Sequence, residues 1–221
     1  MGQTILSEYQ KKAFTFLKEQ PVVTRFFYLS GGTALAEYYL QHRYSEDFDF
    51  FTDEENFPEQ EVMVCIQELK VYIAADEVIL KRTHDRRIFF LKRASEELKI
   101  EFTYYPFKRI DIFCHDKKLN IDALKDIVAN KMQALMNRLE PKDFVDIYFI
   151  AQEKNISFQE MHELFYFKFG LKIDPITLGS ECAKVRSLKD LPRMIKPLTI
   201  EELKAFFSAK AKELQSTIIE T

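Results

Sequence analysis

Tryptophan is absent from this sequence of 221 residues, glycine occurs only five times, and cysteine only three times. The three cysteines, Cys65, Cys114 and Cys182, lie far apart and are odd in number. This pattern indicates neither a disulfide framework nor a zinc site with closely spaced ligands. We therefore expect reduced thiols that fill the core of a cytoplasmic protein.

An excess of charge of one sign is also missing, since the formal net charge is only −3. Any surface that binds nucleic acid must therefore be local. No apolar run is long enough for a membrane span, so no membrane contact is predicted. The Walker A, GxGxxG and HExxH motifs are absent and no Ser-His-Asp arrangement stands out, so nothing indicates the enzyme classes built on them.

The hydrophobic content of 47% is enough for a substantial core, as one domain or two small ones. The most informative segment runs from Phe26 to Thr52, FFYLSGGTALAEYYLQHRYSEDFDFFT. It predicts a short strand, a break at Gly31–Gly32, a helix over 33–40 that Thr33 caps, and a second strand over 47–51.

The second of these strands carries two aspartates in the pattern DxD. Side chains two residues apart on a strand share a face, so Asp47 and Asp49 point the same way, about 6.5 Å apart along the chain. Two carboxylates on one face repel each other unless a cation lies between them. Mg²⁺ (or Mn²⁺) is the usual ion, because it takes oxygen ligands and keeps positions for substrate phosphates.

The glycines supply the other half of such a site. Gly31 and Gly32 let the backbone approach a ligand closely, and the amides at the start of the helix at Thr33 favour an anion. Phosphate at the turn and metal on the acidic strand together describe a site for a nucleoside triphosphate (NTP). The alternative is an exposed acidic strand edge beside an ordinary glycine turn.

The order of these features resembles the signature of the nucleotidyltransferase (DNA polymerase β-like) superfamily: GGT, a short helix, then a DxD strand. More narrowly, GGTAL…HRYSEDFDFF is similar to the AbiEii/AbiGii-type toxin nucleotidyltransferases. The similarity continues in DIVANK (126–131), KMQALMNR (131–138) and KDFVDIY (142–148), and it covers residues 28–150.

This resemblance implies a metal-dependent enzyme that transfers a nucleotidyl group from an NTP to an acceptor, either RNA/tRNA or protein. It also implies the toxin of a toxin–antitoxin or phage-defence pair, with a separately encoded antitoxin, and a third carboxylate on a neighbouring strand. Glu101 is the candidate for that carboxylate, as a metal ligand or as the base for the acceptor hydroxyl. The alternatives are a solvent-facing Glu101 and, for the whole chain, an inactive nucleotide-binding or partner-binding protein of the same fold.

Two cations and one acid follow in the matching helical region. Lys131 and Arg138 are about two helical turns apart and so project from one helix face. The resemblance assigns both to the triphosphate; the alternative is an ordinary exposed helix face. Asp143 begins the next helix, where it can orient Lys131, take part in catalysis, or complement the helix N-terminus.

Other charged residues carry weaker expectations. Arg43 and Ser45, in the loop before Asp47, can position phosphate, brace the carboxylates, or simply be solvated. Asp126 is expected to cap a helix or form a salt bridge locally. The basic run KRTHDRRIFFLKR (81–93) is interpreted as a solvated strand face that discourages edge pairing, with binding of RNA phosphate or an acidic partner as the alternative.

The whole pattern predicts an α+β fold: a mixed sheet with flanking helices, then an all-helical region. The expected elements are helices at 7–18 and 58–69, strands at 77–83, 87–92 and 99–105, and helices at 122–139, from 141, 157–167, 174–185 and 199–214. The polar stretch 115–120 divides a nucleotidyltransferase-like domain (1–115) from a helical domain (116–221), which we expect to close the active-site cleft.

Overall fold

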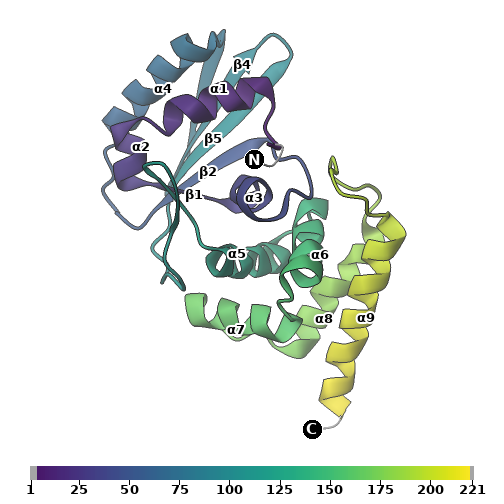
Figure 1. Cartoon of the computed structure of the whole chain (residues 1–221). Helices are drawn as coiled ribbons and strands as arrows, with labels where there is room; N and C mark the ends of the chain where they lie inside the picture. Colours follow the sequence, from purple (N-terminus) through teal and green to yellow (C-terminus); the bar gives the residue numbers. More distant parts are fainter. Residues whose placement is uncertain (1–3, 220–221) are drawn as a thin grey trace. The chain divides into compact units, whose positions relative to one another are not determined.

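The computed structural model describes residues 4–219, with side chains up to residue 214. The chain forms two compact units, whose helices and strands are labelled in Figure 1. The first unit comprises the residues up to 39, 45–107 and 111–123; the second comprises 40–44, 108–110 and the chain from 124. The predicted α+β fold is confirmed, because a mixed sheet with helices is followed by a helical region.

A sheet of seven strands forms the first unit within the described residues, in the order β3-β4-β5-β2-β1-β7-β6. The pairs β2–β5 and β1–β7 are parallel, and the other neighbouring pairs are antiparallel. The strands are β1 (Tyr28–Ser30), β2 (Asp47–Thr52), β3 (Glu77–Arg82), β4 (Arg86–Arg93), β5 (Glu96–Tyr104), β6 (Cys114–Asp116) and β7 (Leu119–Ile121). The helices between them are α1 (Glu8–Leu17), α2 (Pro21–Phe26), α3 (Gly31–Ala34) with the π-helical turn η1 (Leu35–Leu40), and α4 (Glu59–Ile73).

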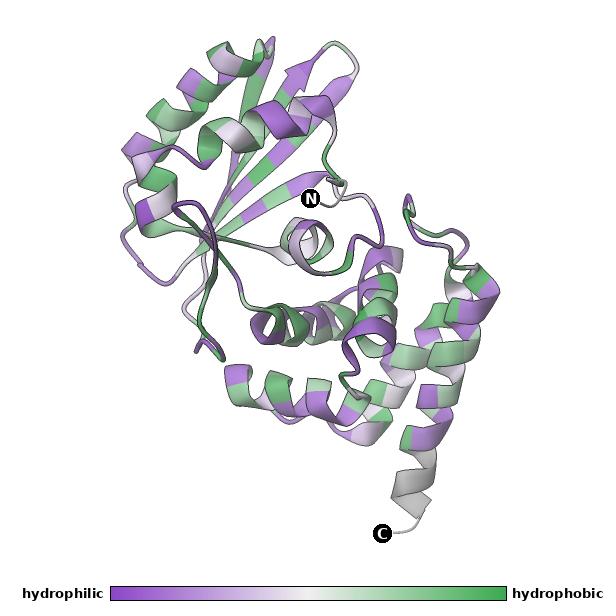
Figure 2. Cartoon of the chain, viewed as in Figure 1, coloured by the Kyte–Doolittle hydropathy of each residue, from purple (hydrophilic) through white to green (hydrophobic). Residues whose placement is uncertain are grey.

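Alternation of side chains gives the sheet one apolar face, and Figure 2 shows it as green and purple bands along the strands. In β2, Phe48 and Phe50 are fully buried, whereas Asp47 and Asp49 lie on the other face. Phe14 of α1 packs on Phe48 with ring centroids 5.2 Å apart, and Figure 1 shows α1, α2 and α4 on that side. The acidic residues of β2 therefore face away from these three helices.

The hairpin β6–β7 occupies the stretch that the sequence analysis treats as a polar connection. Leu119 and Ile121 are fully buried, so this segment belongs to the sheet of the first unit, which continues to residue 123. Each strand has only three residues, too few to produce a recognisable alternation. Cys65 and Cys182 are buried as predicted, but the prediction for Cys114 of β6 is wrong, because its side chain is exposed.

Helices form the second unit. They are α5 (Leu124–Asn137), α6 (Pro141–Lys154), α7 (Phe158–Phe169), α8 (Pro175–Ala183), the 3₁₀ turn η2 (Lys184–Ser187) and α9 (Ile200–Ile219). Phe144 of α6 and Phe207 of α9 are buried against each other, with ring centroids 4.9 Å apart. The predicted capping box at the start of α7 is confirmed, since Ser157 and Glu160 exchange side-chain and backbone bonds. Over residues 4–219, no helix combines the length and the apolar character that crossing a membrane requires.

Candidate active site

Strand β1 passes directly into helix α3 at Gly31, so the predicted break is a sharp entry into a helix. Gly31 has φ +71°, a conformation that residues with side chains rarely adopt. A Cβ atom at this position would lie 2.2 Å from Oδ2 of Asp49. Gly31 therefore permits both the turn and the close approach of the acidic strand, and Gly32 follows it as the second residue of α3.

Thr33 does not cap the helix, and that prediction is wrong because α3 already begins at Gly31. The N-cap position is held by Ser30, whose hydroxyl donates to Oδ2 of Asp122 over 2.6 Å instead of capping the helix. The Thr33 hydroxyl donates to the backbone carbonyl oxygen of Asp47. Thr33 thus ties the glycine helix to the first residue of the acidic strand.

The sheet brings the three candidate carboxylates of the first unit onto neighbouring strands. Asp49 of β2 is paired in register with Ser30 of β1 on one side and with Glu101 of β5 on the other. Asp47 is paired with Lys99 of β5. Parallel strands in register place these side chains on the same face, so Glu101 lies next to the DxD motif, on the face where the sequence analysis expects it.

Lys99 lies between these acids. Its ammonium is 3.3 Å from Oδ2 of Asp47 and 3.3 Å from Oε2 of Glu101. Burial lowers the pKa of Lys99, but the charges of Asp49, Asp47 and Glu101 outweigh it, so the pKa is raised and the side chain stays protonated. Glu101 is buried and also accepts a bond of 2.8 Å from the Thr103 hydroxyl.

The donor set of β2 suits a hard divalent cation that also binds substrate. Within residues 4–219 no three His, Cys, Asp or Glu side chains are grouped closely enough to hold a metal by themselves. Mg²⁺ commonly uses only one or two carboxylates and completes its shell with water and phosphate oxygens. Asp47, whose side chain is 31% exposed, and Asp49 provide such a pair. The residues present therefore fit Mg²⁺ that arrives together with a phosphate ligand.

A second charged cluster lies in the helical unit. The Lys131 ammonium of α5 is 3.1 Å from Oδ1 of Asp143 and 2.6 Å from Oδ2 of Asp146, and all three residues are buried. Arg138 binds Asp143 with two nitrogens, Nε at 2.6 Å and Nη2 at 3.1 Å. The Arg138 side chain is 49% exposed, so one end of this cluster reaches solvent.

Asp146 is the centre of the cluster. Besides Lys131, its carboxylate accepts from Nε and Nη2 of Arg43, at 2.7 and 2.8 Å, and bonds Nε2 of His42 at 2.7 Å. Sequence reasoning did not single out His42, although it stands beside Arg43 in the quoted motif HRYS. The Nδ1 atom of this buried histidine has no hydrogen-bond partner.

Burial and charge oppose each other in this cluster. Burial raises the pKa of Asp143, but Lys131 and Arg138 outweigh it and the pKa is lowered. For Asp146 burial is likewise outweighed, by Arg43, Lys131 and His42, and the pKa lies well below its usual value. Burial lowers the pKa of His42 more than Asp146 raises it, so this ring is neutral and donates from Nε2.

Residues 15–217 match the family described as "Nucleotidyl transferase AbiEii toxin, Type IV TA system". The chain belongs to this family. It is 30% identical over 189 residues to the uncharacterized protein aq_aa25 of Aquifex aeolicus (strain VF5), which covers 85% of this chain and 87% of that protein. The chain is therefore a nucleotidyltransferase-family toxin of a toxin–antitoxin system, and membership implies a nucleotide substrate and an antitoxin partner.

Two solved structures share the fold of this AbiEii-family chain. JHP933 from Helicobacter pylori is similar with a TM-score of 0.60 and 19% identity, over 97% of this chain and 95% of that one. The nucleotidyltransferase toxin MenT4 from Mycobacterium tuberculosis H37Rv is similar with a TM-score of 0.55 and 12% identity, over 95% and 86%. At these identities the similarity concerns the fold alone.

The loop residues of this AbiEii-family chain differ from one another in their contacts. Arg43 is buried, with its guanidinium on Asp146 and on the Tyr44 carbonyl oxygen. Ser45 is also buried, and its carbonyl oxygen accepts from Nε2 of Gln10 over 2.8 Å. The carboxylate that Arg43 binds is therefore Asp146 of the helical unit, whereas the sequence analysis considered the carboxylates of the acidic strand.

The remaining charged residues are mostly bound to neighbours. Asp126 forms a buried salt bridge of 2.7 Å with Lys168, so a salt bridge is present as expected, but its partner lies 42 residues further along the chain and is not local. In the basic run, Arg82 and Arg87 bind Glu59 of α4, and Arg93 binds Glu96. Pairing within the first unit thus accounts for these three arginines, which fits a strand face rather than a nucleic-acid surface.

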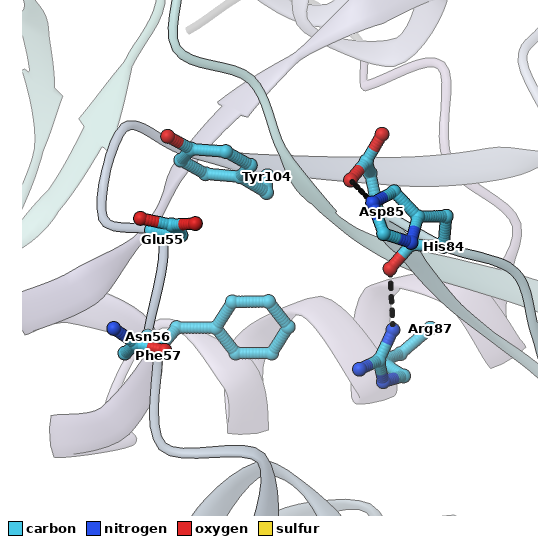
Figure 3. A pocket seen from close by; sticks show the side chains of 7 residues that line it. All are labelled: Glu55, Asn56, Phe57, His84, Asp85, Arg87 and Tyr104. Atoms are coloured by element: carbon cyan, nitrogen blue, oxygen red, sulfur yellow. Dashed lines mark hydrogen bonds and ion pairs between the residues drawn. The ribbon is translucent and has the colours of Figure 1, made fainter.

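A pocket opens beside the turn between β3 and β4 (Figure 3). In Figure 3, His84, Asp85 and Arg87 lie on one side of it, opposite Phe57 and Tyr104. Arg87 donates to the His84 carbonyl oxygen over 3.4 Å. Glu55 and Asn56 complete the lining, so none of the candidate site residues lines this pocket.

Proposed function

We propose that this AbiEii-family chain transfers a nucleotidyl group from an NTP to an acceptor, RNA/tRNA or protein, with Mg²⁺ (or Mn²⁺) as cofactor. The observation that carries the proposal is the close approach of Asp49 to Gly31. A Cβ atom at position 31 would lie only 2.2 Å from Oδ2 of Asp49. Only glycine lets the turn suited to phosphate and the strand suited to metal approach so closely. The proposal goes beyond family membership by naming the ion, the residues and the acceptor classes.

In this proposal, Asp47 and Asp49 would hold the ion through their carboxylates. When bound, a divalent ion supplies Lewis-acid polarisation of the phosphoryl oxygens and offsets their charge. The backbone amides at Gly31, Gly32 and Thr33 bind β- and γ-phosphate oxygens at the start of α3. The hydroxyl of Thr33 is already used to hold the Asp47 carbonyl oxygen, so we assign its amide to phosphate and its side chain to positioning.

Glu101 is proposed as the third carboxylate. Its register next to Asp49 suits a further metal contact, and its two partners Thr103 and Lys99 hold it on the strand face. As a base it would take the proton of the acceptor hydroxyl. Lys99, protonated between Asp47 and Glu101, offsets the repulsion between these acids.

The helical unit contributes cationic charge in this proposal. Lys131 and Arg138 are assigned to the triphosphate through their motif. Arg138 is the better phosphate ligand of the two, because half of its side chain is exposed while Lys131 is buried between two aspartates. Asp143 orients both cations, and we assign it no proton transfer, because its lowered pKa suits an ion pair.

Incubation of purified protein with each labelled NTP, Mg²⁺ and total cellular RNA or protein tests the function. Label is expected to enter RNA or protein with one preferred nucleotide, and to be lost on chelation of the metal. The matched control is Asp85→Ala, which removes an exposed carboxylate from the turn between β3 and β4. Nucleotide binding without transfer to any acceptor would instead support the alternative, an inactive nucleotide-binding or partner-binding protein.

A further inference from the structure

Two short segments belong to the helical unit although the chain on both sides of each belongs to the first unit: Leu40–Tyr44 and Lys108–Ile110. Each is fixed by a buried aspartate of the helical unit, and each aspartate also binds a buried lysine. Asp126 accepts from the Ile110 amide at 3.1 Å and from Lys168 at 2.7 Å. Asp146 binds the other segment and Lys131.

The segment 40–44 is held by side chains and backbone together. Arg43 and His42 both bind Asp146. The amide of Tyr44 donates to the carbonyl oxygen of Arg193 over 2.9 Å, and the carbonyl oxygen of His42 accepts from Ile195 and Lys196 at 2.9 and 3.0 Å. Three consecutive residues, 42–44, are thereby fixed.

The fixed segment leads directly into the acidic strand, because β2 begins with Asp47 only three residues after Tyr44. A chain of three residues spans at most about 11 Å, so the position of Tyr44 limits where Asp47 can lie. The intervening Ser45 is held through its own carbonyl oxygen by Gln10. The other segment, 108–110, is followed along the chain by β6, which carries no candidate site residue.

We infer that Asp146 is a positioning residue for nucleotidyl transfer: through Arg43 and His42 it fixes the segment that sets the start of the metal-binding strand, and through Lys131 it orders the cationic helix. The inference rests on the proposed function of Asp47 and Asp49. In this inference Asp126, which is also buried and paired with a lysine, serves the fold of the helical unit. The two aspartates therefore form a matched pair for experiment.

Asp146→Asn and Asp126→Asn each remove one buried charge without a change of size. We expect both variants to lose thermal stability, but Asp146→Asn alone to lower kcat, by about 10- to 100-fold, with a smaller change in KM for the NTP. Binding of Mn²⁺ in the presence of the NTP, followed by electron paramagnetic resonance, should weaken about tenfold in Asp146→Asn and stay within about twofold in Asp126→Asn.

Hydrogen exchange gives a readout that does not depend on activity. The amides of Tyr44, Ile195 and Lys196 should exchange at least about tenfold faster in Asp146→Asn, while those of β5 keep their protection. If Asp146→Asn does not fold, Arg43→Lys is the second variant, since it keeps the charge but loses the two-nitrogen contact. It should accelerate the same amides and lower kcat.

Equal losses of kcat in the two aspartate variants, or unchanged Mn²⁺ binding in Asp146→Asn, would overturn the inference. Failure of the proposed function gives a different result: the wild-type protein would bind no Mn²⁺ with any NTP. If the wild-type protein binds Mn²⁺, and Asp47→Ala abolishes this binding while Asp146→Asn leaves it intact, the proposed function stands and the positioning role of Asp146 is rejected.

Discussion

The two charged clusters of this protein use similar residues in opposite ways. On the sheet, Lys99 lies between Asp47 and Glu101, and Arg86 is 3.5 Å from Glu101. In the helical unit, Arg43, Lys131 and Arg138 bind Asp143 and Asp146. Asp47 of the first cluster is partly exposed, whereas both carboxylates of the second cluster are fully buried among their cations.

Because of this difference, the sheet cluster is suited to bind a metal ion, whereas the helical cluster is suited to hold segments of its own unit together. A buried carboxylate with two or three cationic partners is a poor metal ligand, because its negative charge is already offset. Asp143 and Asp146 are of this kind, and their lowered pKa values express the same balance. The acids of β2 and β5 lie on a partly exposed strand face, so a divalent ion that arrives with phosphate can offset their charge.

The largest loss of transfer activity is expected when both aspartates of β2 are replaced. Asp47→Ala combined with Asp49→Ala should reduce transfer at least about 1,000-fold, because the ion and the charge it offsets are both lost. The fold should persist, since neither side chain belongs to the core, and thermal unfolding checks this. Activity that survives in the double variant would show that the sheet cluster is not the catalytic one.

A smaller loss is expected for Glu101→Gln. If Glu101 takes the acceptor proton, kcat should fall about 100- to 1,000-fold while the affinity for the NTP stays nearly unchanged. Glu97→Gln is the matched control, because Glu97 lies on the same strand and is exposed. A variant with normal kcat and reduced stability would make Glu101 only a partner of Lys99 and Thr103.

Two glycines with similar positive φ angles, one in each unit, allow a direct comparison of the units. Gly31 has φ +71° and Gly170, after α7, has φ +68°. Alanine should destabilise either position by about 1–2 kcal/mol because of the left-handed conformation. At Gly170 a Cβ meets nothing within 4 Å, whereas at Gly31 it displaces the Asp49 carboxylate.

Gly31→Ala should therefore lower transfer about 100-fold, and Gly170→Ala should leave it unchanged. Denaturant unfolding and steady-state kinetics on both variants measure the two effects separately. Equal activity in both would mean that the approach of Gly31 to Asp49 has no functional role.

The residues of the sheet cluster could be predicted from the sequence more completely than those of the helical cluster, for physical reasons. Period-two alternation fixes the faces of β2 and β5, so Asp47, Asp49 and Glu101 could be assigned to one side before strand order was known. The start of α3 was placed two residues late, because glycines are poor helix formers and conceal a helix that begins with them.

The helical cluster was less accessible, because its contacts join distant positions in the chain. Arg43 and Asp146 are 103 residues apart, and no local pattern shows that they meet. Spacing correctly placed Lys131 on an inner helix face but did not reveal that two aspartates enclose it. The contact between Asp143 and Lys131 was among the alternatives considered, since the two lie on consecutive helices.

The smallest expected effect is a pH dependence that comes from His42 in the helical cluster. Burial lowers its pKa from the usual 6.5, so the unfolded chain binds the proton more readily than the folded one. Stability should therefore fall as the pH drops below about 6.5. Asp143 and Asp146 have lowered pKa values, so their stabilising charge is present above about pH 4 and is lost only in stronger acid. The range from pH 6.5 to 5 thus isolates the histidine.

His42→Gln, which keeps a donor toward Asp146 and cannot take a proton, should flatten the fall of Tm between pH 6.5 and 5, whatever its effect on Tm at pH 7.5. His84→Gln is the control, because His84 is almost fully exposed in the turn of the first unit and should leave the slope unchanged. Thermal unfolding of the three proteins at closely spaced pH values measures the slopes. A wild-type Tm that stays constant over this range would show that the His42 ring takes up a proton in the folded protein as readily as in the unfolded chain. The folded cluster would then carry a further positive charge beside Arg43 and Lys131.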